Sequence, residues 1–194
     1  MTKPVGVLSL QGDFREHLQA FSRLGIPAIG VKTLGELESV SGLVIPGGES
    51  TTIGKLARIF NLFEPLQTAI QDGLPVFGTC AGLIMLADSI TDGIVGQETF
   101  GGLDVVVQRN AFGNQLDSFE VDLPFAGIEG HVHAAFIRAP LITSVGNAVE
   151  VVARLEDGRV VGVLQDKRLG ISFHPEVTGE DRIHSFFYDA LVCA

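Results

Sequence analysis

Short apolar segments alternate with helix-forming segments through the first half of the chain, and this alternation restricts the possible folds more than any other feature. Apolar runs at residues 5–10, 28–31, 43–45 and 75–77 are each followed by a turn and by signals for the start of a helix. Strands that alternate with helices form βαβ units and a mainly parallel sheet. The runs are apolar at consecutive positions, as expected for strands that helices cover on both faces. The first half therefore predicts a three-layer α/β architecture.

Capping signals set the expected helix boundaries. Two pairs have the spacing of a capping box, in which a side chain at the helix start and one three residues later bond each other's backbone. These pairs are Asp13 with Glu16 and Thr33 with Glu36. Ser50 or Thr51 is expected to cap a further helical stretch that runs to about residue 72, with a break at Pro65. Another helix is expected to begin at residues 81–87.

The second half of the chain is rich in strand signals and poor in helix signals. Strand-like segments occupy residues 105–107, 118–121, 132–137, 149–155, 160–164 and 169–173. The pair Asp157-Gly158 predicts a hairpin turn between two of them. A closing helix is expected over residues 179–192. The sequence thus predicts a mainly parallel central sheet flanked by helices, with an additional antiparallel strand region, in one domain over residues 1–194.

Composition excludes several classes of function. The formal charge is −10, whereas binding to nucleic acid or to an anionic membrane needs clustered Lys and Arg. Disorder does not fit a chain with 46% hydrophobic residues. The apolar run at residues 5–10 is too short for a signal peptide or a membrane span. The chain has two cysteines, Cys80 and Cys193, which fits a reducing, cytoplasmic setting.

The strongest local signal for chemistry is the run Gly-Thr-Cys-Ala-Gly at residues 78–82. It follows a strand and opens a helix, as in the nucleophile elbow, with sulfur in place of a serine hydroxyl. Small flanking residues let strand and helix approach each other closely. The helix dipole favours a Cys80 thiolate, and the backbone N–H of Ala81 is placed to bind an oxyanion. The alternative is an inert buried cysteine that happens to precede a helix.

A base for this thiol is expected in the run His174-Pro175-Glu176. It follows an apolar strand, and α/β sheets place catalytic groups at the carboxyl ends of strands. In an extended segment, residues two apart point the same way, so His174 and Glu176 can face one point. A structural histidine is the usual alternative. It is weakened here by the strand end, the adjacent carboxylate and the separate elbow cysteine.

A glycine-rich turn is the third element, Pro-Gly-Gly-Glu-Ser at residues 46–50. It too lies between a strand and a helix, and its glycines let the backbone approach a ligand with N–H groups exposed. Taken alone, it could be an ordinary strand-to-helix turn.

The remaining histidines give no functional prediction. His131 and His133 share a strand face, but no third ligand is evident nearby, so no metal site is expected. His17 and His184 are expected on the surfaces of helices.

The three motifs, in this order, resemble those of the class I glutamine amidotransferases, whose fold is flavodoxin-like. Further segments resemble one branch, the glutaminase subunits of pyridoxal 5′-phosphate synthases. The matching segments are Leu10-Gln11-Gly12, Arg15-Glu16-His17, residues 46–52, residues 77–84, Arg109-Asn110, residues 117–120, residues 136–140 and residues 172–176. The resemblance covers nearly the whole chain, with residues 89–102 as its weakest stretch.

The resemblance implies a set of site residues. Cys80, His174 and Glu176 fall on the family's catalytic triad. Its glutamine contacts fall on Gly48, Glu49, Ser50, Arg109, Ile137 and Arg138. The oxyanion would be held by the N–H groups of Gly48 and Ala81. No metal and no cofactor are implied.

The implied activity is hydrolysis of L-glutamine to glutamate and ammonia through a glutamyl thioester. The implied partner is a (β/α)₈-barrel synthase in a hetero-oligomer, which would build pyridoxal 5′-phosphate with the ammonia. Three alternatives remain open from sequence: a related glutaminase of another pathway, a stand-alone cysteine hydrolase, and an inactive scaffold that binds a partner.

Overall fold

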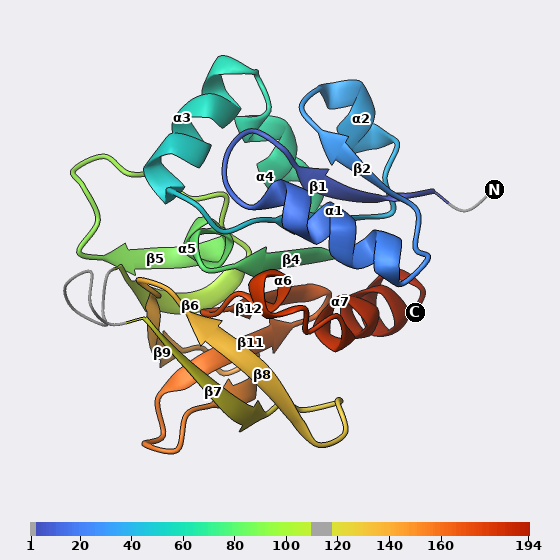
Figure 1. Ribbon diagram of the computed structural model, residues 1–194. Coiled ribbons are helices and arrows are strands. Elements are labelled where there is room, and N and C mark those ends of the chain that lie inside the picture. Colours follow the sequence, from blue (N-terminus) through green and yellow to red (C-terminus); the bar gives the residue numbers. More distant parts are fainter. Residues whose placement is uncertain (1–2, 110–117) are drawn as a thin grey trace.

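The computed structural model describes residues 3–109 and 118–194, so Asn110 and Asp117 of the matching segments lie outside it. Helices lie on both faces of a central sheet, and a two-stranded ribbon lies beside it (Figure 1). This arrangement confirms the predicted α/β fold with a mainly parallel sheet and an antiparallel region in the second half.

The first half follows the predicted alternation of strands and helices closely. Its elements are β1 (Val5–Leu8), α1 (Phe14–Arg23), β2 (Ala28–Val31), α2 (Leu34–Glu38), β3 (Gly42–Ile45), α3 (Ser50–Ile59), α4 (Phe63–Gln71), β4 (Val76–Thr79) and α5 (Ala81–Leu86). Every predicted strand of this half is present.

The second half contains the predicted strands and two more. Its elements are β5 (Ala87–Thr91), β6 (Leu103–Gln108), β7 (Phe119–Pro124), β8 (His131–Phe136), β9 (Leu141–Val145), β10 (Glu150–Arg154), β11 (Val160–Gln165), β12 (Arg168–Ile171), α6 (Pro175–Thr178), α7 (Arg182–Phe187) and the π-helical turn η1 (Tyr188–Val192). Strands β5 and β9 were not predicted. The hairpin at Asp157-Gly158 is confirmed, since β10 and β11 pair in antiparallel fashion around it and Gly158 has φ 88°.

The ten-stranded sheet has the order β2-β1-β3-β4-β12-β11-β9-β6-β5, with β10 paired to β11. Strands β2, β1, β3, β4 and β12 pair in parallel, and β11 and β9 continue the sheet in antiparallel pairings. Strands β7 and β8 form the separate ribbon. The last strand in sequence therefore lies in the middle of the sheet, beside β4.

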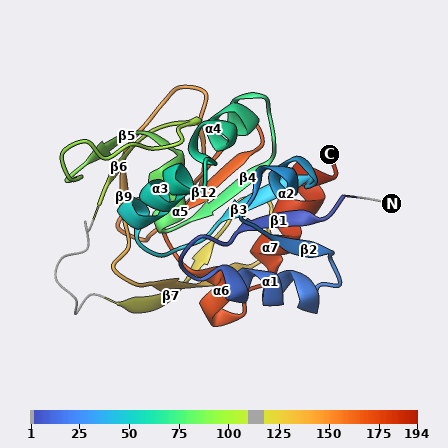
Figure 2. The ribbon, with the colours of Figure 1, turned by 90° about the horizontal axis from the view of Figure 1, so that it is seen from above.

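Residues alternate between the two faces of this sheet. Along β3, Leu43 and Ile45 join one buried cluster, with α2, α3, α4 and α5, while Val44 joins the other. The second cluster includes Phe21 of α1, Phe187 of α7 and side chains of β7 and β8. Figure 2 shows the sheet edge-on between these two sets of elements. In the described residues, no helix has the length and apolar character needed to cross a membrane.

Several predicted helix boundaries need correction. The capping box of Thr33 and Glu36 is confirmed, but the Asp13 side chain makes no capping hydrogen bond. Helix α3 is capped by Glu49, whose carboxylate accepts from Thr51 N, and not by Ser50 or Thr51. The break before α4 is not at Pro65. It lies at residues 60–62, where Asn61 has φ 55°, and proline is tolerated in the first turn of a helix.

The predicted closing helix over residues 179–192 is also wrong in its extent. Gly179 has φ 72° and ends α6, and the chain enters a new helix at Arg182. The helical region therefore begins earlier, at Pro175, and is divided by the glycine.

Candidate active site

Three neighbouring parallel strands bring the chemically important segments to one edge of the sheet. Thr79 of β4 pairs with Ile171 of β12, and Gly78 pairs with Ile45 of β3. Cys80 N donates to Ile171 O at 2.8 Å, which places the cysteine directly beside the end of β12. The segments that follow the three strands carry Cys80, His174 and the glycine-rich loop.

Cys80 occupies a strained turn between β4 and α5. Its backbone has φ 50° and ψ −103°, a conformation that costs a non-glycine residue roughly 1–3 kcal/mol. Its side chain is almost buried, with a residue exposure of 7%. This geometry agrees with the elbow expected from the sequence.

The flanking glycines explain how the turn packs. A Cβ added at Gly82 would lie 1.9 Å from Ile45 O, and one added at Gly78 would lie 2.6 Å from the carbonyl carbon of Gly82. Real Cβ atoms do not approach backbone so closely. Glycine at these two positions therefore lets α5 lie directly against β3 and β4.

His174 and Glu176 meet, although not in the predicted extended conformation. Pro175 is the first residue of α6 and His174 precedes it with φ −116° and ψ 86°, so the segment turns into a helix. His174 Nδ1 lies 2.7 Å from Glu176 Oε1, and both side chains are buried. Because Nδ1 is bound to the carboxylate, Nε2 is left available for Cys80, which interacts electrostatically with this imidazole.

The electrostatics of this trio are strong. Burial lowers the pKa of His174, but the hydrogen bonds and negative charges of Cys80 and Glu176 outweigh it and raise that pKa to about 11. Burial raises the pKa of Glu176, and its contact with His174 opposes the rise. The arrangement favours an imidazolium between two anionic groups, which is the state a thiolate nucleophile needs.

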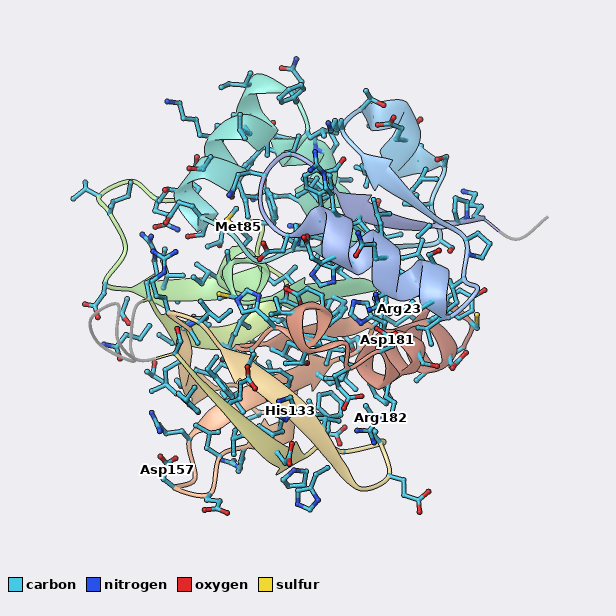
Figure 3. The ribbon with its side chains drawn as sticks, viewed as in Figure 1. Arg23, Met85, His133, Asp157, Asp181 and Arg182 are labelled. Atoms are coloured by element: carbon cyan, nitrogen blue, oxygen red, sulfur yellow. The ribbon has the colours of Figure 1, made fainter. Side chains whose placement is uncertain are left out.

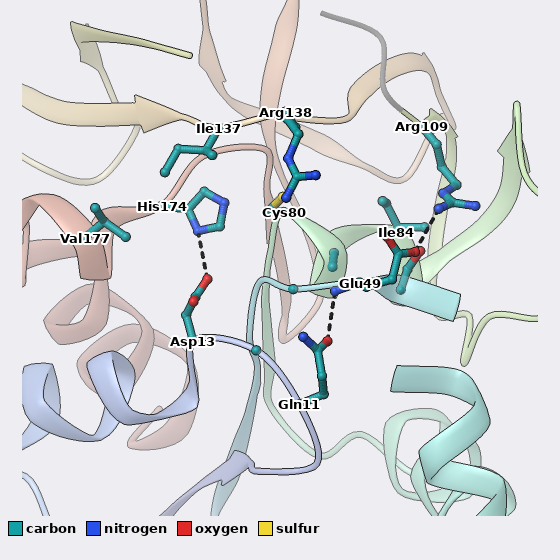
Figure 4. A pocket seen from close by; sticks show the side chains of 14 residues that line it. Gln11, Asp13, Glu49, Cys80, Ile84, Arg109, Ile137, Arg138, His174 and Val177 are labelled. Atoms are coloured by element: carbon teal, nitrogen blue, oxygen red, sulfur yellow. Dashed lines mark hydrogen bonds and ion pairs between the residues drawn. The ribbon is translucent and has the colours of Figure 1, made fainter. Parts of the chain in front are cut away.

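A cavity of about 420 Å³ opens next to Cys80, within the size range of small-molecule sites. Of the site residues expected from sequence, all line it except Glu176, which lies behind His174. The lining comprises Gln11, Gly12, Asp13, Gly48, Glu49, Ser50, Cys80, Ala81, Ile84, Arg109, Ile137, Arg138, His174 and Val177. Figure 4 shows these side chains around the cavity.

The loop after β1 supports the glycine-rich loop. Gln11 Oε1 accepts from Glu49 N at 2.9 Å, and Asp13 N donates to Gly47 O at 3.1 Å (Figure 4 shows the Gln11 bond). A Cβ at Gly12 would lie 1.8 Å from Gly47 O. No site role was predicted for Gln11, Gly12 and Asp13, although they follow the carboxyl end of β1 and could have been found by that rule.

Two arginines from the second half of the chain, Arg109 and Arg138, line the cavity. Arg109 follows β6 and bonds Glu49 Oε1 at 2.9 Å and Gln97 Oε1 at 2.6 Å. Arg138 follows β8 in a left-handed conformation with φ 47°. Two guanidinium groups in one cavity suit a ligand that carries a carboxylate.

Asp13, His174 and Glu176 are grouped closely enough for their ligand atoms to lie within 4.8 Å of one another. Asp13 Oδ2 is 3.7 Å from His174 Nδ1, while that nitrogen already has its close partner in Glu176 Oε1. The group therefore consists of the hydrogen-bonded pair His174 and Glu176, with the Asp13 carboxylate nearby. The other histidine pair, on β8, is engaged elsewhere: His133 bonds Asp122 and Glu120 of β7.

The predicted surface positions of His17 and His184 are wrong. Both histidines are fully buried, and His17 Nδ1 lies 2.8 Å from His184 Nε2. The sequence did contain a signal for the burial of His17. Its spacing with Ala20 and Phe21 puts all three residues on one face of α1, and that face is buried.

Fold and site together define the class of the protein, the class I glutamine amidotransferases. A solved glutamine amidotransferase is 49% identical, with a TM-score of 0.91 over 98% of this chain and 99% of its own. The profile of the SNO glutamine amidotransferase family matches residues 7–193, and the chain belongs to that family.

Two relatives both carry the name pyridoxal 5′-phosphate synthase subunit PdxT. The one from Leifsonia xyli is 59% identical over 184 residues, covering 94% of this chain and 93% of its own. The one from a Nocardioides species is 54% identical over 189 residues, covering 95% of this chain and 94% of its own. A chain in the PurLQS structure from Thermotoga maritima, at 18% identity and a TM-score of 0.69 over 98% of this chain and all of its own, shares the fold.

Proposed function

We propose that this chain hydrolyses L-glutamine to glutamate and ammonia, as the glutaminase subunit of a pyridoxal 5′-phosphate synthase. Membership of a glutamine amidotransferase family and the names of the relatives at 54% and 59% identity support it. The observation that carries the proposal is the imidazole of His174, which contacts Cys80 and Glu176 beside a cavity lined by two arginines.

The reaction begins with the Cys80 thiolate. Its sulfur attacks the side-chain amide carbon of glutamine, and the N–H groups of Gly48 and Ala81 hold the oxyanion that forms. As the carbon–nitrogen bond breaks, His174 gives its proton to the departing ammonia and a glutamyl thioester remains. His174 then takes a proton from water, the resulting hydroxide attacks the thioester, and glutamate leaves. Glu176 holds the imidazole in the required tautomer and stabilises its cation.

Glutamine is held by polar groups that line the same cavity as Cys80. Arg109 and Arg138 supply positive charge for the α-carboxylate, and Glu49 and Ser50 supply oxygens for the α-ammonium group. Ile137 contacts the substrate beside Arg138. The scheme uses no metal and no cofactor.

The ammonia is passed to a partner subunit. We propose that the partner is a (β/α)₈-barrel synthase, which combines the ammonia with ribose 5-phosphate and glyceraldehyde 3-phosphate, and that the two chains form a hetero-oligomer. A synthase partner is consistent with the names of the relatives.

The test is a glutamate-release assay with and without the candidate synthase. The synthase should raise glutamine turnover and co-elute with this chain on size exclusion. Cys80→Ala should abolish turnover and leave the circular dichroism spectrum unchanged. The exposed Cys193 supplies the matched control, and Cys193→Ala should keep full turnover. Near-normal glutamate release by Cys80→Ala, or turnover of γ-glutamyl peptides and not of glutamine, would contradict the proposal.

A further inference from the structure

A buried histidine lies next to the proposed catalytic trio and has no role in the proposed reaction. His17 of α1 is fully buried, and its Nε2 lies 3.2 Å from Thr79 Oγ1 and 3.7 Å from Glu176 Oε2. Glu176 uses its other oxygen, Oε1, for His174. Among the described residues, Glu176 Oε2 is buried and has no hydrogen-bond partner at normal distance. His17 Nε2 therefore bonds the Thr79 hydroxyl and at the same time faces this unpaired oxygen.

The hydrogen bond between the two buried histidines selects the tautomer of His17. Its Nδ1 lies 2.8 Å from His184 Nε2, so one of these nitrogens donates and the other accepts. If His17 donated, its Nε2 would accept from Thr79 Oγ1 and would also direct its lone pair toward the Glu176 carboxylate. His184 Nδ1 would then carry a buried N–H, although no partner for that atom is present in the described part of the chain. Buried N–H groups without a partner are rare, so His184 donates and His17 carries its proton on Nε2.

Both rings stay neutral in this arrangement. Burial, followed by the nearby charges of His184 and His174, lowers the pKa of His17 well below its ordinary value. Burial likewise lowers the pKa of His184 to about 4, with Asp181 opposing and Arg23 adding to the effect. His17 therefore offers Glu176 the N–H dipole of a neutral ring.

The surroundings hold both rings in place. Phe21 of α1 and Phe77 of β4 make edge-to-face contacts with His184, with ring centroids 5.2 and 5.7 Å away. Arg23 of α1 forms a two-pronged ion pair with Asp181, just before α7, at 2.6 and 2.7 Å. Figure 3 shows Arg23 and Asp181 between these two helices. The helices that carry His17 and His184 are thus joined at the surface as well as in the core.

We propose that His17 is a positioning residue, fixed by His184, whose Nε2–H faces Glu176 Oε2 and keeps that carboxylate ionised and oriented toward His174. This inference rests on the proposed function, because it acts through the same trio. Loss of the donor would let the buried Glu176 take up a proton. The imidazolium of His174 would then lose its partner charge, and the Cys80 thiolate would form only at higher pH. The titratable groups that face this cluster are His174, Asp13 and His184, with Asp181 and Arg23 beyond.

The pH dependence of Cys80 alkylation by iodoacetamide tests the proposal on the full chain. Mass spectrometry of the two cysteine peptides separates Cys80 from Cys193, whose labelling serves as an internal reference. His17→Gln places an amide nitrogen near the Nε2 position, whereas His17→Asn places it near Nδ1 and removes the N–H that faces Glu176. We expect His17→Asn to raise the pH of half-maximal Cys80 labelling by about one unit or more, and His17→Gln to remain near the wild type.

Two comparisons make the outcomes decisive. If His17→Asn is folded and labels with the wild-type pH dependence, while His174→Ala does not, the proposal for His17 is overturned and the trio stands. If His174→Ala also labels as the wild type does, the trio itself fails. With the synthase present, His17→Asn should lower kcat for glutamine and leave KM nearly unchanged.

A measurement on the wild-type chain avoids dependence on a variant. Nitrogen-15 chemical shifts of the histidine side chains distinguish a protonated ring nitrogen from an unprotonated one. We expect a protonated Nε2 and an unprotonated Nδ1 for His17 near neutral pH. A proton on Nδ1 instead would overturn the proposal even if every His17 variant failed to fold.

Discussion

At the scale of single residues, Arg109 lines the cavity with a guanidinium that two neighbours hold in place. Its guanidinium lies between the Glu49 carboxylate and the Gln97 amide, at 2.9 and 2.6 Å, and its side chain is only 10% exposed. These contacts fix the direction of the guanidinium and leave its remaining donors available. The planar fork of arginine suits this position, whereas a lysine ammonium is a single point charge.

Arg109→Lys should therefore raise KM for glutamine by roughly tenfold, about the effect of one lost charge-assisted hydrogen bond, with a smaller change in kcat. Steady-state glutamate release in the presence of the synthase measures both constants. Arg154→Lys, in the β10–β11 hairpin, is the matched control and should behave as the wild type does. An unchanged KM in Arg109→Lys would remove Arg109 from the substrate contacts.

Residue types at strand ends made much of the site predictable. Cys80 was predicted from the nucleophile-elbow motif and the loop from its glycines, while His174 was predicted from the rule that catalytic groups follow the carboxyl ends of strands. The meeting of His174 and Glu176 was predicted for the wrong reason, because the segment is not extended and turns into a helix at Pro175. His17 was missed because a histidine on a helix is usually solvated, and only its spacing with Ala20 and Phe21 indicated burial.

At the scale of elements, the contact of α5 with β3 decides whether the cysteine turn can form. Gly82, in the first turn of α5, lies directly against the backbone of Ile45, which leaves no room for a methyl group. A side chain there would push the helix away from the sheet and alter the backbone that carries Cys80. The contact therefore serves both packing and the geometry of the turn that carries Cys80.

Gly82→Ala should destabilise the fold by more than about 2 kcal/mol, because backbone of β3 must move to admit a Cβ. Urea unfolding of the purified chain measures the change. Gly35→Ala is the control, since a Cβ at Gly35 meets nothing within 4 Å, and its helical position should make alanine neutral or stabilising by up to about 1 kcal/mol. Equal stabilities for Gly82→Ala and the wild type would contradict this account.

Most elements were predictable, and the failures have local causes. Strand β5 follows α5 without any turn residue between them, so Ala87 was assigned to the helix. Strand β9 is a short segment, Leu141–Val145, without a clear alternation of apolar and polar residues. Glu49 became the helix cap in place of Ser50 because the cap depends on where the preceding glycines turn the chain, which the sequence does not specify.

At the scale of the whole molecule, both halves of the chain build one sheet. Strand β12 pairs with β4 on one side and with β11 on the other, so the parallel and antiparallel parts share a continuous ladder. We propose on this ground that residues 1–194 form one domain. The buried histidines make the stability of the whole fold depend on pH, because they bind protons more readily in the unfolded chain than in the folded one.

The free energy of unfolding should fall as the pH is lowered from about 6.5 to about 4. His184 has an ordinary pKa of 6.5, and burial lowers it to about 4 in the folded chain. Between these values the unfolded state binds more protons, so acid favours unfolding, by roughly 3 kcal/mol in total for this residue. His17 acts in the same direction.

Urea unfolding across this pH range checks the prediction in wild type and His184→Gln. The variant should lose stability less steeply with acid, while contributions of opposite sign, such as that of Glu176, are common to both proteins. His131→Gln, at an exposed position, should follow the wild-type curve. Parallel curves for wild type and His184→Gln would show that His184 is not buried in its neutral form.

The central position of β12 also has a consequence for synthesis. A ribosome makes β4 and its cysteine long before it makes Arg168–Ile171 and the histidine that follows. Until then, the growing chain presents β4 as an open sheet edge, which is prone to pair with other chains. The proposed nucleophile Cys80 cannot be activated during this interval, because the proposed base His174 has not yet been translated. Termination before the codon for Arg168 would thus release a chain that has Cys80 but lacks both β12 and the proposed base His174.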